Sequence, residues 1–104
     1  MPIPKRSVRV YLRSGVLQKI YNNESGLSRN EYVAGLIYWG LVSGKGMKVI
    51  DDWAYEPKYD LSFGISFELE KSIDKYAKAR KLTRAKGVER LIELGIVLER
   101  RNSK

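Results

Sequence analysis

The chain carries an internal repeat, and this repeat constrains the fold more than any other feature of the sequence. Residues 27–41 read LSRNEYVAGLIYWGL and residues 82–96 read LTRAKGVERLIELGI, which places the second copy 55 residues after the first. Six of the 15 aligned pairs are identical, namely Leu27/Leu82, Arg29/Arg84, Val33/Val88, Leu36/Leu91, Ile37/Ile92 and Gly40/Gly95. A repeat at a fixed spacing predicts two copies of one supersecondary unit, stacked so that each covers the apolar face of the other.

Each copy predicts an amphipathic helix that begins at a polar N-cap. The hydroxyl groups of Ser28 and Thr83 can each accept a hydrogen bond from an unpaired backbone N–H. Glu31 completes a capping box in the first copy, and the second copy lacks an acidic residue there, which predicts a weaker cap. Gly40 and Gly95 each cost a helix roughly 1 kcal/mol relative to alanine, so we interpret both as packing positions. The apolar residues at helical spacing are Val33, Leu36, Ile37 and Leu41, then Val88, Leu91, Ile92 and Ile96.

A strand and a shorter helix precede each long helix. Residues 7–13 and 60–66 alternate between apolar and polar side chains, which is typical of a strand with one face in water. Ser14 and Ser66 then open the short helices. The side chains expected to face the core from the strands are Val8, Val10, Leu12, Leu61, Phe63 and Ile65. Each copy is therefore strand–helix–helix, and residues 47–58 are the predicted connector.

The composition removes several classes of active site. The sequence contains no Cys and no His, which excludes disulfides, thiolate zinc sites, Cys nucleophiles and His-dependent triads. Residues 40–46 read GLVSGKG, but this segment is one residue short of a phosphate-binding loop and follows a helix where that loop follows a strand. The carboxylates form no evident nucleophile–base pair. We therefore expect no enzymatic activity, no metal and no cofactor.

The length and the apolar content predict one small folded unit. The 104 residues are 43% apolar, enough for a core, so wholesale disorder is not expected. No apolar run approaches the roughly 18 residues that a membrane span needs, and residues 1–5 lack the apolar segment of a signal peptide. These features predict a soluble intracellular protein.

The net charge of +8 is concentrated in the two repeats. Residues 1–46 hold 7 basic and 2 acidic side chains, residues 59–104 hold 11 basic and 7 acidic ones, and the connector is mildly acidic. Two basic segments favour binding to a polyanion, because each Lys or Arg at a phosphate releases a counterion. The alternative is ordinary solubilising charge. A membrane surface is less suitable, because the helix expected near residues 67–80 mixes acidic residues with its lysines and has no clean basic face.

The order of these elements resembles the ribbon-helix-helix (Arc/MetJ-like) DNA-binding family. The resemblance depends on the alternating strand, on the pattern Ser66-x-x-Leu69-x-x-x-Ile73-Asp74-x-x-Ala77, and on the residues that open each long helix at Leu27 and Leu82. It covers residues 7–43 and 60–98. The tandem form looks like small transcriptional regulators of archaeal viruses. The resemblance implies that the two strands pair antiparallel and enter the major groove of B-DNA.

The fold implied by the resemblance is α+β, a tandem ribbon-helix-helix with a two-stranded antiparallel ribbon over four helices. One copy of about 45 residues is too small to be stable alone, so the repeats are expected to share one core. The domains are then residues 1–46, the connector 47–58 and residues 59–104. A connector of this length holds the second copy at millimolar effective concentration, so we expect one pseudo-twofold unit within the chain, with pairing between chains as the alternative.

The resemblance assigns base recognition to the outward side chains of the ribbon. These are Ser7, Arg9, Tyr11 and Arg13 on the first strand and Ser62 and Gly64 on the second. Arg can bond guanine through two donors, and Tyr can donate to a base or pack on a thymine methyl group. Asp60 should repel phosphates unless it accepts from a cytosine amino group. The first strand is therefore expected to supply most of the base contacts; the alternative is that Arg9 and Arg13 only protect a strand edge.

The resemblance assigns phosphate binding to the start of each long helix. Free backbone N–H groups, the positive end of the helix dipole and an adjacent arginine suit this role. The predicted phosphate contacts are Ser28, Arg29, Thr83 and Arg84, with Lys5 and Arg6 as an N-terminal arm. Helix capping alone is the alternative role for the two hydroxyl residues.

The sequence analysis therefore predicts a sequence-specific transcriptional regulator that binds double-stranded DNA in the cytoplasm, which is the host cytoplasm if the chain is viral. Tyr38, Trp39, Trp53, Tyr55 and Tyr59 are expected to pack the connector onto the helices, and they also offer a surface for self-association into oligomers on DNA. An alternative function is an antitoxin-like protein-interaction module with secondary DNA binding. Only about five residues follow the last predicted helix, whereas antitoxins of the family carry a long tail.

Overall fold

The computed structural model describes the backbone of residues 5–44 and 55–102, and the side chains of residues 7–44 and 55–101. The elements occur in the order β1 (Lys5–Arg13), α1 (Ser14–Tyr21), α2 (Arg29–Ser43), β2 (Lys58–Ser66), α3 (Phe67–Ala79) and α4 (Arg84–Asn102). The order strand–helix–helix therefore occurs twice, as the repeat predicts. Most of the predicted connector lies outside the described residues.

The protein is α+β, with four helices and a two-stranded antiparallel sheet in the described residues. The strands pair along their whole length, and Arg9 lies opposite Ser62 at the centre of the nine pairs. Both strands begin two residues before the predicted ranges 7–13 and 60–66. Lys58, assigned to the connector from the sequence, belongs to β2 because it pairs with Arg13.

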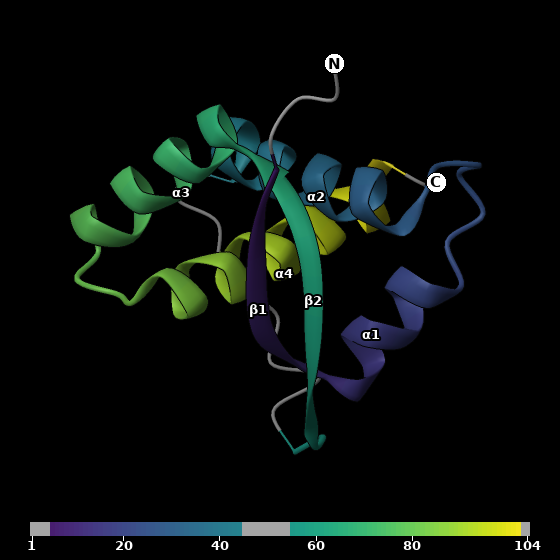
Figure 1. Ribbon diagram of the computed structural model, residues 1–104. Coiled ribbons are helices and arrows are strands. Elements are labelled where there is room, and N and C mark those ends of the chain that lie inside the picture. The colour runs from purple at the N-terminus through teal and green to yellow at the C-terminus, as the bar shows by residue number, and fades with distance from the viewer. Residues whose placement is uncertain (1–4, 45–54, 103–104) are drawn as a thin grey trace.

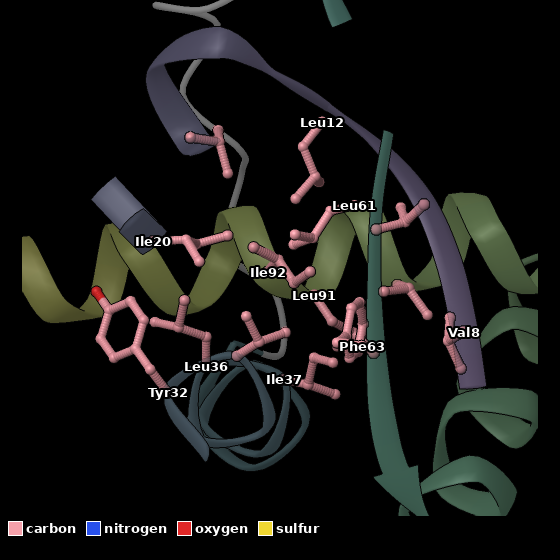
Figure 2. Close-up of a cluster of buried hydrophobic side chains, with 14 of the residues drawn as sticks. Val8, Leu12, Ile20, Tyr32, Leu36, Ile37, Leu61, Phe63, Leu91 and Ile92 are labelled. Carbon is pink, nitrogen blue, oxygen red and sulfur yellow. The ribbon is translucent and has the colours of Figure 1, made fainter. Parts of the chain in front are cut away.

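One face of this sheet is buried against the helices, as the alternation of apolar residues predicts. Figure 1 places α1 and α3 on opposite sides of the two strands, with α2 and α4 behind them. Figure 2 shows side chains of both strands meeting those of α2 and α4. The inward strand residues are all buried, namely Val8, Val10, Leu12, Leu61, Phe63 and Ile65. A single apolar cluster contains residues of both repeats, so the two copies share one core.

The long helices α2 and α4 cross at the two glycines that the sequence marked as packing positions. A Cβ at Gly40 would lie 2.7 Å from the backbone oxygen of Leu91, and a Cβ at Gly95 would collide with the backbone of Leu36. The two contacts are reciprocal, since Gly40 corresponds to Gly95 in the repeat and Leu36 to Leu91. This reciprocity is expected of two copies related by an approximate twofold axis.

The short helices begin differently in the two repeats. At α3, the Ser66 hydroxyl accepts a hydrogen bond from the backbone N–H of Leu69 (3.2 Å). At α1, the side chain of the N-cap residue Arg13 makes no capping hydrogen bond to the start of the helix. The backbone N–H of Ser14 donates to the carbonyl of Pro57 (3.0 Å), and that of Gly15 donates to a carboxylate oxygen of Glu56 (2.8 Å). The segment before β2 therefore stabilises the start of α1, with a negative charge at the positive end of the helix dipole.

Candidate nucleic-acid interface

The sheet face that points away from the helices is polar and open to solvent. Ser7, Arg9, Tyr11 and Ser62 are exposed on it, as predicted, and Gly64 is half-buried. The register places these residues in adjacent cross-strand pairs, with Ser7 opposite Gly64 and Arg9 opposite Ser62. We call this face, made of Ser7, Arg9, Tyr11, Asp60, Ser62 and Gly64, the ribbon surface. Its functional groups offer both hydrogen-bond donors and acceptors.

Arg9 and Asp60 form an ion pair on the ribbon surface. The Nε and Nη2 atoms of Arg9 donate to the same Asp60 oxygen, Oδ2, at 3.2 and 2.9 Å. Both side chains remain open to water, with exposed fractions of 66% and 50%. The sequence placed both residues on this face, but only the register shows that they lie on a cross-strand diagonal, because Asp60 pairs with Tyr11.

The end of the ribbon near α1 is held by internal contacts. Arg13 is half-buried, and its Nη1 donates to the backbone oxygen of Glu56 at 2.6 Å. Its cross-strand partner Lys58 donates to the carboxylate of Glu89 on α4 at 2.9 Å, and this hydrogen bond raises the pKa of Lys58. Arg13 is thus less available to an external ligand than Arg9.

The N-terminus of α2 carries the complete capping box that the sequence predicts. The Ser28 hydroxyl accepts from the backbone N–H of Glu31 (3.2 Å), and the Glu31 carboxylate accepts from the backbone N–H of Ser28 (3.3 Å). Arg29 is exposed, with its guanidinium carbon 5.5 Å from the centre of the Tyr21 ring. Within the described part of the chain, Arg29 forms no ion pair.

The N-terminus of α4 differs from that of α2 in charge. The Thr83 hydroxyl accepts from the backbone N–H of Lys86 (3.2 Å), which is half of a capping box. Arg84 donates to both oxygens of Asp74 (2.7 and 2.8 Å) and lies 3.4 Å from a Glu70 oxygen. The bond to Asp74 raises the pKa of Arg84 and neutralises its charge locally. Of the two arginines that open the long helices, only Arg29 presents its charge unpaired to the solvent.

The predicted N-terminal arm and the predicted aromatic packing residues lie only partly within the described structure. The side chains of Lys5 and Arg6, predicted as an N-terminal arm, lie outside the described part of the structure, as does Trp53. Tyr38 and Tyr55 do not pack as predicted. The side chain of Tyr38 is 64% exposed, and that of Tyr55 is fully exposed. Tyr59 is also exposed and pairs with Leu12 near one end of the two strands. Trp39 is half-buried.

One titratable residue near the interface was not singled out from the sequence. Glu93 lies on α4, half-buried, and burial raises its pKa to about 7, with the negative charge of Glu89 adding to the effect. The fold buries Glu93 and brings Lys58 and Arg13 of the ribbon close to it, which the local sequence around Glu93 does not reveal. The pairing of Arg84 with Asp74 was missed for the same reason, since it depends on how α3 and α4 pack.

No group of three or more acidic side chains that could hold a metal ion occurs within residues 5–44 and 55–102. Over the same residues, every helix is too short or too polar to cross a lipid bilayer. Comparisons with protein-family models, curated proteins and solved structures found no match to this chain.

Proposed function

We propose that this chain is a sequence-specific transcriptional regulator that binds double-stranded DNA as a tandem ribbon-helix-helix protein. The observation that carries the proposal is the two-stranded ribbon itself. Its apolar face is buried on four helices, while its opposite face displays Arg9, Tyr11 and Ser62 to solvent. A surface with no role in the core and with two long polar side chains, Arg9 and Tyr11, is suited to recognition of an external ligand.

The dimensions and chemistry of the ribbon surface fit the major groove. That groove of B-DNA is about 12 Å wide and admits a two-stranded ribbon. Arginine matches the two acceptors of guanine, tyrosine can donate to a base or contact a thymine methyl group, and serine can bond either kind of edge group. The net charge of +8 favours approach to a polyanion.

The helix N-termini provide an unequal phosphate clamp in this proposal. At α2, unpaired backbone N–H groups, the helix dipole and the exposed Arg29 act together. At α4, the Arg84 charge is already balanced by Asp74 and Glu70. The first repeat therefore holds the backbone more strongly, and the preferred DNA site is expected to be asymmetric.

Selection from a random duplex library, followed by binding measurements on the selected and scrambled duplexes, tests the proposal. Arg9→Ala should remove most of the preference for the selected sequence, because a bidentate base contact contributes about 1–3 kcal/mol of discrimination. Lys78→Ala removes the same charge from the exposed last turn of α3 and should weaken binding to both duplexes slightly and equally. Failure to enrich any sequence, or equal losses on both duplexes for Arg9→Ala, would contradict the proposal.

A further inference from the structure

The ion pair of Arg9 and Asp60 uses only part of the hydrogen-bonding capacity of the arginine. A guanidinium has five N–H donors in a rigid plane. The Nε–H and one Nη2–H point to Asp60 Oδ2. The remaining three donors are on Nη1 and Nη2, and no residue of the described structure accepts a hydrogen bond from Nη1. One edge of the guanidinium is occupied, and the edge formed by Nη1 and Nη2 is open.

The open edge has the geometry that guanine requires. Two parallel N–H groups of one arginine match the O6 and N7 acceptors on the major-groove edge of guanine. Asp60 holds the adjacent edge of the guanidinium, which restricts the rotation of a long side chain before DNA arrives. Fixing a side chain in its bound orientation reduces the entropy lost on binding.

The carboxylate of Asp60 retains an acceptor as well. Both arginine contacts go to Oδ2, and no described residue donates to Oδ1. In the major groove, the exocyclic amino group of cytosine donates to a carboxylate. The pair of side chains therefore presents two donors and one acceptor from neighbouring points of the same surface.

We propose that Arg9 and Asp60 form one recognition unit that reads a guanine through the open edge of Arg9 and an adjacent cytosine amino group through Asp60. This inference rests on the proposed function and adds the base chemistry that the ribbon selects. Asp60 has a second role in this inference. Its negative charge lies close to the duplex, so it weakens binding to sequences that offer the carboxylate no hydrogen-bond donor.

The recognition unit has no counterpart at the equivalent positions of the two strands. The strands of the two repeats correspond at an offset of 53 residues, as the two nine-residue strands starting at Lys5 and Lys58 show. At this offset the counterpart of Arg9 is Ser62, and the counterpart of Asp60 is Ser7. Neither serine can reproduce an arginine–carboxylate pair. The preferred DNA site therefore contains one such guanine near the centre of the ribbon contact, and no second guanine at the position related to it by the pseudo-twofold axis.

Binding of the selected duplex and of single-base variants is measured for the wild-type protein, Arg9→Lys, Asp60→Ala and the control Lys78→Ala, which lies outside the ribbon surface in the exposed last turn of α3. The wild-type protein should prefer guanine at one position by about 5- to 150-fold, the range expected for a bidentate pair. Arg9→Lys keeps the charge but not the two-pronged geometry, so it should lose this preference while its affinity for scrambled duplex stays within about twofold. Asp60→Ala should reduce the guanine preference several-fold and raise the affinity for scrambled duplex. Lys78→Ala should leave the guanine preference unchanged.

A modified base separates direct reading from indirect effects. A duplex with 7-deazaguanine at that position lacks the N7 acceptor, so the wild-type protein should bind it more weakly and Arg9→Lys should not distinguish it from guanine. An Arg9→Ala/Asp60→Ala double variant should show no further loss of guanine preference relative to Arg9→Ala, and it should lose the preference for the adjacent cytosine as well. Asp60→Ala is expected to fold, because an exposed ion pair contributes at most about 1 kcal/mol.

The outcomes for the recognition unit and for the proposed function are distinguishable. If the protein selects a sequence, but Asp60→Ala retains the full guanine preference or 7-deazaguanine binds as well as guanine, the recognition unit is wrong and the proposed function stands. If the wild-type protein binds every duplex alike, the proposed function itself is wrong.

Discussion

Glu93 shows how far equivalent residues of the two repeats have diverged. It lies on α4 at the position that Tyr38 holds on α2, 55 residues earlier. Tyr38 is 64% exposed, whereas Glu93 is half-buried close to Glu89, Lys58 and Arg13. Burial disfavours the charged carboxylate, and the pKa of Glu93 rises to about 7.

The raised pKa of Glu93 predicts a loss of stability on going from acidic to neutral pH. The folded protein holds the Glu93 proton up to a pH of about 7, whereas the unfolded chain releases it near its ordinary pKa of 4.5. The stabilisation is thus complete below pH 4.5 and is lost as the pH rises through 7. Because the side chain keeps some contact with water, we expect a contribution of about 1–2 kcal/mol.

Urea unfolding of Glu93→Gln between pH 5 and pH 8 measures this contribution. The variant should gain stability relative to the wild-type protein at pH 8, and the gain should shrink toward pH 5. Glu24→Gln removes a carboxylate from an exposed loop position and serves as the control, with a small effect at both pH values. An equal effect of Glu93→Gln at both pH values would contradict the assignment.

At the scale of elements, the crossing of α2 and α4 determines how the repeats fit together. Gly40 and Gly95 let each helix approach the backbone of the other, and the residues around the crossing are the most deeply buried of both helices, including Ile37 and Ile92. Close packing leaves no room for an added methyl group without a backbone shift. The separation of the helices in turn positions the strands above them.

A pair of glycine substitutions tests the importance of this crossing. Gly95→Ala places a Cβ against the backbone of Leu36, so we expect it to destabilise the protein by about 1–3 kcal/mol despite the better helix propensity of alanine. Gly35→Ala lies on the exposed side of α2, where an added Cβ meets no atom within 4 Å, and should stabilise by up to about 1 kcal/mol. Opposite signs in thermal or urea unfolding are expected; a stabilising Gly95→Ala would show that the helices do not pack this closely.

At the scale of the whole molecule, the charge is distributed unequally between two similar halves. The arginine–carboxylate pair of the ribbon surface is formed by Arg9 of the first repeat. Among the described residues, the long-helix N-terminus with an unpaired arginine is also in the first repeat, at Arg29. In the second repeat, Asp74 and Glu70 balance Arg84. The fold is thus close to symmetric in its backbone order and asymmetric in its surface charge.

This asymmetry predicts that substitutions at the two equivalent arginines, Arg29 and Arg84, change the salt dependence of DNA binding differently. Binding to duplex DNA should weaken with salt, and Arg29→Ala should lower the slope of log K against log salt concentration by about 1, the value for one phosphate contact. Arg84→Gln should leave the slope near that of the wild-type protein, because the Arg84 charge is already paired. Affinities measured from low to moderate salt for the three proteins give the slopes. Equal reductions for both variants would show that both helix N-termini bind phosphates.

The sequence predicted the elements and the buried faces well, because both are local consequences of residue spacing. Alternation over residues 7–13 and 60–66 identified the inward side chains, and the repeat identified Gly40 and Gly95 as packing positions. Pairings between distant charged residues were not predicted. Arg84 with Asp74 depends on the packing of α3 against α4, and the half-burial of Arg13 depends on where the segment before β2 lies.

Hydrophobic periodicity and the duplication by themselves determined that this chain forms two strand–helix–helix units with one apolar face each, because helix and strand geometry relate spacing directly to side-chain direction. Only the tertiary structure decided which polar groups on the outer face are available. The antiparallel register brings Asp60 onto a diagonal with Arg9, and the helix packing supplies carboxylates to Arg84 but none to Arg29 among the described residues. Electrostatic contacts depend on distances of a few ångströms between residues far apart in the chain, and such distances exist only after the core has formed.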